Sequence, residues 1–292
     1  MEKTKDQIYH FIVAFVVTGL AFISVPSVAQ QKIVKSGFGQ ATVDMLGISS
    51  GSDVATVSDR LKEHARGWPE RPGQLIQSES TFGTGSLAQK YTYQITLGLT
   101  ASDQEEMEKR GVNSEEIRVR FTAPPSGNGA YLFYRTLSGK EQSLEAFFTR
   151  MIEKYGIPSF VGNGLVFYIY KDGKLLSDGK SYTSMSAAAA LARKTPGPPV
   201  DVATKTNLMD CGELGMSRDL SGISAARDHK RVGCDAVLYF RLLPFGDRFS
   251  VFTSGFLDIL RTAEAGQIDA KALDEIKKQD LKSRPVAPPS KL

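Results

Sequence analysis

The segment Ile117–Leu137, IRVRFTAPPSGNGAYLFYRTL, determines the fold class. Its first six residues alternate apolar with charged or polar side chains, which is the period of a strand that buries one face. A turn-rich stretch, 123–129, contains two prolines and two glycines and leads into a second apolar run, 130–137. These two runs predict an antiparallel β-hairpin.

The same patterns recur on both sides of this hairpin. Residues 89–98 alternate like a half-buried strand, residues 164–177 form a hairpin around Asp172-Gly173, and residues 233–255 contain two more strands. Apolar residues recur with helical spacing in 53–65 and 142–155. We therefore predict an α+β fold, in which an antiparallel sheet of hairpins carries two main amphipathic helices on one face.

Local signals set the ends of these elements. Ser52 is the expected N-cap of the first helix, and Gly156 is the expected left-handed C-cap of the second, with Pro158 preventing its continuation. The charged segment 102–116 is predicted to be a connector with some helix. Residues 256–263 are predicted to form a short amphipathic helix at most.

The composition along the chain predicts one folded domain. This single α+β domain spans 41–266 and contains an Ala/Pro-rich connector at 184–206. Residues 267–292 are polar and charged, so they are expected to form a disordered tail. The domain is preceded by a predicted signal peptide, 1–29.

The N-terminal segment has the features of an export signal. Lys3 and Lys5 precede an uncharged apolar run, 11–25, and small residues then predict cleavage between Ala29 and Gln30. The alternative is a retained membrane anchor, but the run has 15 residues and a spanning helix needs about 18 or more. We therefore expect a soluble periplasmic or secreted protein with no stable membrane anchor after cleavage.

Charge and histidine content exclude some classes of function. The net charge is +4 on 292 residues, and acidic and basic residues are interspersed, which does not indicate nucleic-acid binding. Outside the signal, His64 and His229 are the only histidines. No motif for a cofactor or a metal stands out.

The chain has two cysteines, Cys211 and Cys234. In an oxidising compartment an even count predicts one intramolecular disulfide. The alternative is a metal site that uses both thiolates with His229, but it lacks a fourth obvious ligand and any C-x-x-C pair.

Two serine motifs resemble parts of known active sites. Gly47, Ser49 and Gly51 fit G-x-S-x-G, but a hydrolase nucleophile follows a central strand with several βα units upstream. Ser49 is therefore interpreted as part of a helix entry. Ser177 and Lys180 fit S-x-x-K, but turn-forming residues lie between them and no companion motif occurs, so we assign no catalytic residue.

Six tyrosines occur at strand spacing. If exposed, they would form a protein-recognition surface, and if buried they would pack under the helices with their hydroxyl groups at the rim. The candidate binding surface comprises Tyr91, Tyr93, Tyr131 and Tyr134, and the other two are Tyr168 and Tyr170.

Three motifs suggest a family resemblance. LGISSGSDVATVSDRL resembles the opening of SmpA/OmlA-type small envelope proteins, which implies a helix layer packed on a short antiparallel sheet. Together with IRVRFTAPPSG and EKYGIPS, it makes the chain more similar to uncharacterised exported proteins of Gram-negative bacteria. The resemblance covers about Val43 to Lys174, implies no catalytic residues, and differs from the SmpA/OmlA group in lacking a lipidated cysteine.

The sequence therefore predicts an exported protein with a non-catalytic binding or envelope-associated role. Its partner would be an envelope protein or ligand of unknown identity, and no cofactor is expected. The alternative is an exported hydrolase that uses carboxylates or Ser49.

Overall fold

The computed structural model describes most of the chain after the predicted signal. The described residues are 34–41, 43–66, 74–101, 105, 109, 111–162, 164–182, 184, 199–217 and 222–283. Residues 31–292 belong to one compact unit. The signal peptide, its cleavage site at Ala29 and Gln30, and most of the 184–206 connector lie outside the described residues.

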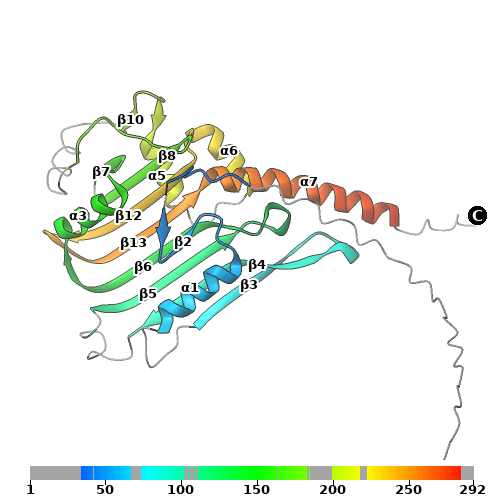
Figure 1. Ribbon diagram of the computed structural model, residues 1–292, viewed down its shortest axis with the longest axis horizontal. Coiled ribbons are helices and arrows are strands. Elements are labelled where there is room, and N and C mark those ends of the chain that lie inside the picture. The colour runs from blue at the N-terminus through cyan, green and yellow to red at the C-terminus, as the bar shows by residue number, and fades with distance from the viewer. Residues whose placement is uncertain are drawn as a thin grey trace, which may run out of the picture. The chain divides into compact units, whose positions relative to one another are not determined.

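A nine-stranded antiparallel sheet forms the centre of this unit (Figure 1). Its strand order is β3-β4-β5-β6-β13-β12-β8-β7, and β9 also pairs with β8. The strands are β3 (Gln74–Phe82), β4 (Gln89–Thr100), β5 (Val112–Phe121), β6 (Ala130–Ser143), β7 (Phe160–Gly162), β8 (Leu165–Lys171), β9 (Lys174–Leu175), β12 (Ala236–Phe245) and β13 (Arg248–Asp258). The predicted α+β class is confirmed.

Each predicted hairpin is present in the sheet. Strands β5 and β6 pair as expected, and so do β12 and β13. In the β8–β9 hairpin, Asp172 and Gly173 have φ angles of +50° and +70°. Two positive φ angles match the right-handed twist of the strands that the turn joins, which is why Asp-Gly occurs here.

The two faces of the sheet carry separate hydrophobic clusters. In β6, Phe133 and Leu137 belong to one cluster, and Leu132 and Tyr134 belong to the other. We call these the first face and the second face. Strands β4 and β5 contribute to the first cluster only, which explains their clean alternation of apolar and polar residues. Strands β6, β8 and β12 bury both faces and have nearly continuous apolar sequences.

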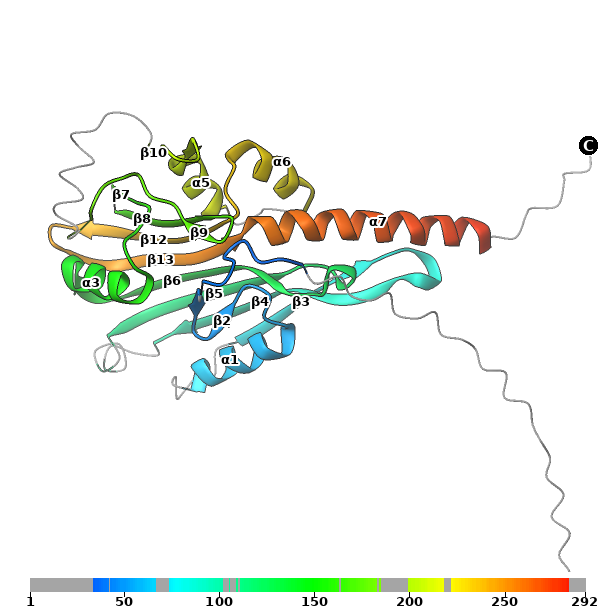
Figure 2. The same cartoon turned by 45° about the horizontal axis from the view of Figure 1, so that its top comes forward.

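Helices pack on both faces, so the predicted arrangement with helices on one face is incomplete. Buried residues of α1 and α3 join the first cluster, and buried residues of α5, α6 and α7 join the second. Figure 2 shows α5, α6 and α7 on the side of the sheet opposite α1. The helices are α1 (Val54–Arg66), α3 (Leu144–Tyr155), α5 (Leu208–Gly215), α6 (Gly222–Val232) and α7 (Ile259–Ser283).

Short elements complete the described structure. A small hairpin, β1 (Asp44–Met45) with β2 (Ile48–Ser49), precedes α1, and a second one, β10 (Val200–Asp201) with β11 (Thr206–Asn207), precedes α5. Two 3₁₀ turns are η1 (Gly85–Leu87) and η2 (Pro124–Ser126). The second hairpin lies within the part of the predicted connector that the structure describes.

Helix α5 lies unusually close to the sheet. Gly212 and Gly215 face β8 and β12, and a Cβ atom built on either glycine would overlap the side chain of Phe167 or Val237. Only glycine allows this approach. The predicted disulfide between Cys211 and Cys234 is confirmed, and it joins α5 to the residues that lead into β12.

The predicted disordered tail is wrong over 267–283, because these residues continue α7 from its packed first turns. They contain no glycine or proline and are rich in good helix formers. Extending a helix that is already anchored avoids the cost of nucleation. The prediction of a short helix over 256–263 is also wrong, because residues 256–258 belong to β13 and the helix that begins at Ile259 continues to Ser283. Residues 284–292 lie outside the described part.

Two further predictions need correction. Residues 112–116 belong to β5 and not to a connector, because Glu115 points inward and is buried despite its charge. The N-cap of α1 is Asp53 and not Ser52. Its carboxylate accepts a 2.7 Å hydrogen bond from the backbone N–H of Thr56, which lies three residues ahead.

The disulfide generates a stability prediction. Changing both Cys211 and Cys234 to Ser should lower the free energy of unfolding by about 2–5 kcal/mol, because the unfolded chain loses its cross-link. Denaturant titration measures this loss, and α1 and the β5–β6 hairpin should stay folded. The intact mass of the native protein should be about 2 Da below that of the reduced protein. Two free thiols in freshly prepared protein would contradict the disulfide.

Candidate functional site

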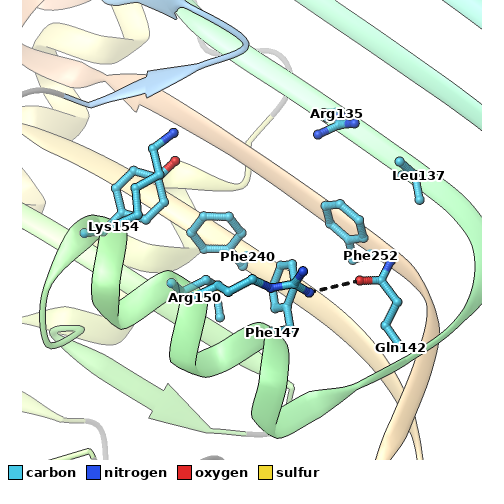
Figure 3. Close-up of a pocket in the computed structure, with 10 residues that line it drawn as sticks. Arg135, Leu137, Gln142, Phe147, Arg150, Lys154, Phe240 and Phe252 are labelled. Atoms are coloured by element: carbon cyan, nitrogen blue, oxygen red, sulfur yellow. Dashed lines mark hydrogen bonds between the residues drawn. The ribbon is translucent and has the colours of Figure 1, made fainter. Parts of the chain in front are cut away.

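A pocket of about 340 Å³ lies between α3 and strands β6, β12 and β13 on the first face of the sheet (Figure 3). Its lining combines aromatic rings with three cationic side chains and contains no carboxylate. The lining residues are Arg135, Leu137, Gln142, Phe147, Arg150, Met151, Lys154, Tyr155, Phe240 and Phe252. We call this pocket the α3 groove.

Helix α3 is fixed at its start and along its inner face. Ser143 caps the helix by accepting a hydrogen bond from the N–H of Ala146, and the N–H of Leu144 donates to a carbonyl in the β12–β13 turn. Phe148 and Met151 are buried against the sheet. These contacts leave Arg150 and Lys154, one helical turn apart, beside the groove.

Aromatic rings form the apolar wall of the groove. The ring of Phe147 lies 6.0 Å from that of Phe240 and 5.4 Å from that of Phe252, measured between centroids. Tyr155 extends the wall along α3, with its ring 5.7 Å from Phe240. Contacts between aromatic rings at these centroid distances are favourable, so the rings pack against one another within the protein itself.

The three cations of the groove differ in their partners. Arg135 donates to Glu115, whose side chain is only 2% exposed. Lys154 lies 3.7 Å from a carboxylate oxygen of Asp44, whose side chain is 32% exposed. Arg150 donates a hydrogen bond to the amide oxygen of Gln142, at 3.4 Å, and forms no ion pair with any described residue.

Glu115 is the centre of a buried ion network. Besides Arg135 it contacts Nε2 of His64, which lies 2.8 Å from its other oxygen. Burial raises the pKa of Glu115, but the hydrogen bond from His64 and the charge of Arg135 outweigh this effect and lower the pKa below its usual value. The network links α1, β5 and β6 beneath the groove.

The end of α3 is tied to the β1 strand. The backbone carbonyl of Asp44 accepts hydrogen bonds from Nζ of Lys154 at 3.4 Å and from the hydroxyl of Tyr155 at 3.1 Å. Burial lowers the pKa of Lys154, but its contacts with Tyr155 and Asp44 outweigh burial and raise the pKa. Lys154 is therefore held in its charged form at the rim of the groove.

Ser49 is the last residue of β2 and contacts the residue that leads into α1. Its backbone N–H donates to the hydroxyl of Ser52, and neither His64 nor His229 contacts it among the described hydrogen bonds. The interpretation of this serine as part of a helix entry fits these contacts.

The neighbouring Ser50 makes the buried contacts of this motif. Its hydroxyl lies 2.5 Å from the carboxylate of Asp258 and accepts a 2.9 Å hydrogen bond from Nε of Arg261. Gly51 has a φ of +89°, and a Cβ atom there would lie 2.8 Å from the Arg261 guanidinium. The packing of the loop against α7 thus explains the final glycine of the G-x-S-x-G sequence, whereas Gly47 lies against Arg60 of α1.

Of the two alternatives for the tyrosines, the buried one holds for Tyr131 and Tyr134, which are 8% and 4% exposed, so these two residues do not belong to an exposed binding surface. Tyr93 is 36% exposed and Tyr91 is partly buried. Strands β4 and β6 are separated by β5, and β6 is covered by the second cluster, so the four tyrosines do not form one exposed surface.

His229 is engaged by Asp235 at 2.7 Å, and both cysteines are in the disulfide. Within the described ranges, no group of three or more His, Cys, Asp or Glu side chains is placed to hold a metal ion. No helix of the described part combines the length and apolar character needed to cross a membrane.

Comparisons with protein-family models, with curated proteins and with solved structures gave no match for this chain. The candidate site therefore rests on its own geometry.

The α3 groove was missed by sequence reasoning, although part of its signal is visible. Phe147 is one of the apolar residues that recur with helical spacing in 142–155, and Arg150 and Lys154 lie three and seven residues after it. Phe240, Phe252 and Arg135 come from three separate strands. Their convergence depends on the order of β6, β13 and β12 in the sheet.

The Glu115 network generates a pH prediction. Because the folded pKa is lowered, the ionised carboxylate stabilises the fold above its ordinary value of 4.5, and this stability is lost as the pH falls through the lowered value. Glu115→Gln should reduce the free energy of unfolding by about 3 kcal/mol at neutral pH. It should also flatten the loss of stability below pH 4.5 in denaturant titrations.

Glu116→Gln is the matched control, because the adjacent Glu116 is 44% exposed and pairs at the surface with Arg118. Its effect should stay below about 1 kcal/mol. Equal effects of the two substitutions would contradict the buried network.

Proposed function

We propose that this protein is a non-catalytic binding protein that takes a small amphiphile with an anionic headgroup into the α3 groove. The observation that carries the proposal is the lining itself, which joins an aromatic wall to three cations and has no carboxylate among its own residues. Arg150 is central because it has no ion pair with any described residue. An anionic headgroup would give this guanidinium a partner.

The size and composition of the groove support a small ligand. Its volume of about 340 Å³ is at the lower end of the usual range for small-molecule sites. The rings of Phe147, Phe240 and Phe252 offer apolar surface to the body of the ligand, and each Å² removed from water contributes roughly 25 cal/mol. A headgroup without an apolar body would leave the aromatic wall of the groove without a contact.

We also propose that the protein acts in the periplasm or outside the cell, in association with the envelope. The Cys211–Cys234 disulfide supports this location, because disulfides persist in oxidising compartments. The Lys3–Lys5 region, the apolar run and the Ala29-Gln30 junction support export.

Removing the unpaired guanidinium should weaken binding of charged ligands. Arg150→Gln is expected to lower the affinity for decyl sulfate about fivefold, because a charge-assisted contact at an exposed site is lost. The affinity for the uncharged decyl glucoside should not change. Isothermal titration calorimetry below the micelle concentration of each probe measures both.

Two further variants complete this experiment. Phe147→Ala should weaken binding of both probes, since the wall contacts the apolar body that they share. Arg60→Gln, which removes an exposed helix cation outside the groove, is the matched charge control. If wild-type protein binds neither probe, or if Arg60→Gln acts like Arg150→Gln, the proposed function is wrong.

The location is tested by fractionation of the native host. The mature protein should begin at Gln30 and should be released with the periplasmic or culture fluid. N-terminal peptide mass spectrometry measures the start. An intact N-terminus in the membrane pellet would mean that residues 11–25 act as an anchor.

A further inference from the structure

We propose that Asp44 is a built-in counter-ion of the α3 groove, which occupies Lys154 in the ligand-free protein and makes the site favour dianionic over monoanionic headgroups. This inference rests on the proposed function and names its ligand class more closely. The expected headgroup is a phosphate monoester.

The geometry shows that the Asp44 carboxylate can be displaced. Its oxygen lies 3.7 Å from Nζ of Lys154, and the two side chains are 32% and 51% exposed. Exposed pairs of this kind hold weakly, because water screens both charges. The backbone carbonyl of Asp44 holds Lys154 and Tyr155 separately, so the carboxylate can release the ammonium group while the lysine stays at the groove.

Arg135 provides the contrast within the same groove. Its partner Glu115 is 2% exposed and is also held by His64. Pulling Arg135 away would leave a buried carboxylate with one partner fewer, which is costly. The three cations therefore differ in what they offer a headgroup. Arg150 has no ion pair with a described residue, Lys154 has a partner that can be displaced, and Arg135 has a buried partner.

Because the three cations differ in their partners, the groove should bind a dianionic headgroup more tightly than a monoanionic one. A monoanion such as a sulfate ester gains most of its attraction from Arg150, since at Lys154 its single sulfate charge only replaces the single carboxylate charge of Asp44. A phosphate monoester carries close to two charges near neutral pH. Its second charge can bind Lys154, which lies one helical turn from Arg150, and it competes better than the single charge of Asp44.

The test compares two probes with the same apolar chain, decyl phosphate and decyl sulfate, by calorimetry at pH 7.5. Wild-type protein should bind decyl phosphate about two- to fivefold more tightly. Asp44→Asn should raise the affinity for decyl sulfate by a similar factor. The difference in affinity between decyl phosphate and decyl sulfate should therefore become smaller. In the background of Lys154→Gln, adding Asp44→Asn should change neither affinity.

The asparagine variant suits this test because its amide oxygen can still accept the hydrogen bond that the N–H of Gly47 donates to Asp44. A gain in affinity cannot result from a failure to fold. Inorganic phosphate is included as a third probe, and its binding should be much weaker than that of decyl phosphate because it does not contact the aromatic wall.

The outcomes separate the two proposals. If the wild type binds neither decyl probe, the proposed function fails and this inference fails with it. If the wild type binds them but Asp44→Asn leaves the affinity for decyl sulfate unchanged or lowers it, only the role of Asp44 is overturned. If inorganic phosphate and decyl phosphate bind equally well, the ligand is not an amphiphile and that part of the proposed function is wrong. The assignment of a phosphate headgroup would still stand.

Discussion

The carboxylate of Asp258 is fully buried at the end of β13, and separate parts of the chain donate hydrogen bonds to it. The hydroxyl groups of Ser36 and Ser50, the N–H of Gly37 and the N–H of Arg261 all reach its two oxygens. Burial raises the pKa of Asp258, so its charge depends on these donors. The N-terminal segment, the loop before α1, β13 and α7 are therefore held at one point.

This point also determines how the faces of the sheet are covered. Asp258 is the N-cap of α7, which starts on the second face. The loop at Ser50 leads to α1 on the first face, and its backbone pairs with Ala130 at the start of β6. Two helices bury residues in the first cluster: α1 starts beside this point, and α3 packs its Phe147 ring against Phe240 of β12 and Phe252 of β13. The α3 groove forms there.

The strands could be predicted because the pattern of apolar residues depends on whether a strand buries one face of the sheet or both. The alternation in β4 and β5 reflects one buried face, and the Asp-Gly turn of the β8–β9 hairpin is a local signal. Helix α5 has no such pattern, since it is short and packs through Gly212 and Gly215. Helix α6 was not predicted, although its sequence is amphipathic. The distal part of α7 has a polar composition, which resembles a disordered tail until its anchored start is known.

The α3 groove was not predictable because its character depends on which charges are already neutralised. The sequence contains Arg135, Arg150 and Lys154 as three similar cations. In the fold, β5 places Glu115 beside Arg135, and β1 places Asp44 beside Lys154. The Glu115 carboxylate is buried, whereas that of Asp44 is partly exposed. Screening by water decides how strong an ion pair is. The three cations therefore differ in how easily each can bind a new anion, although they look equivalent in the sequence. That gradation depends on tertiary structure alone, because neither carboxylate is near its cation in sequence.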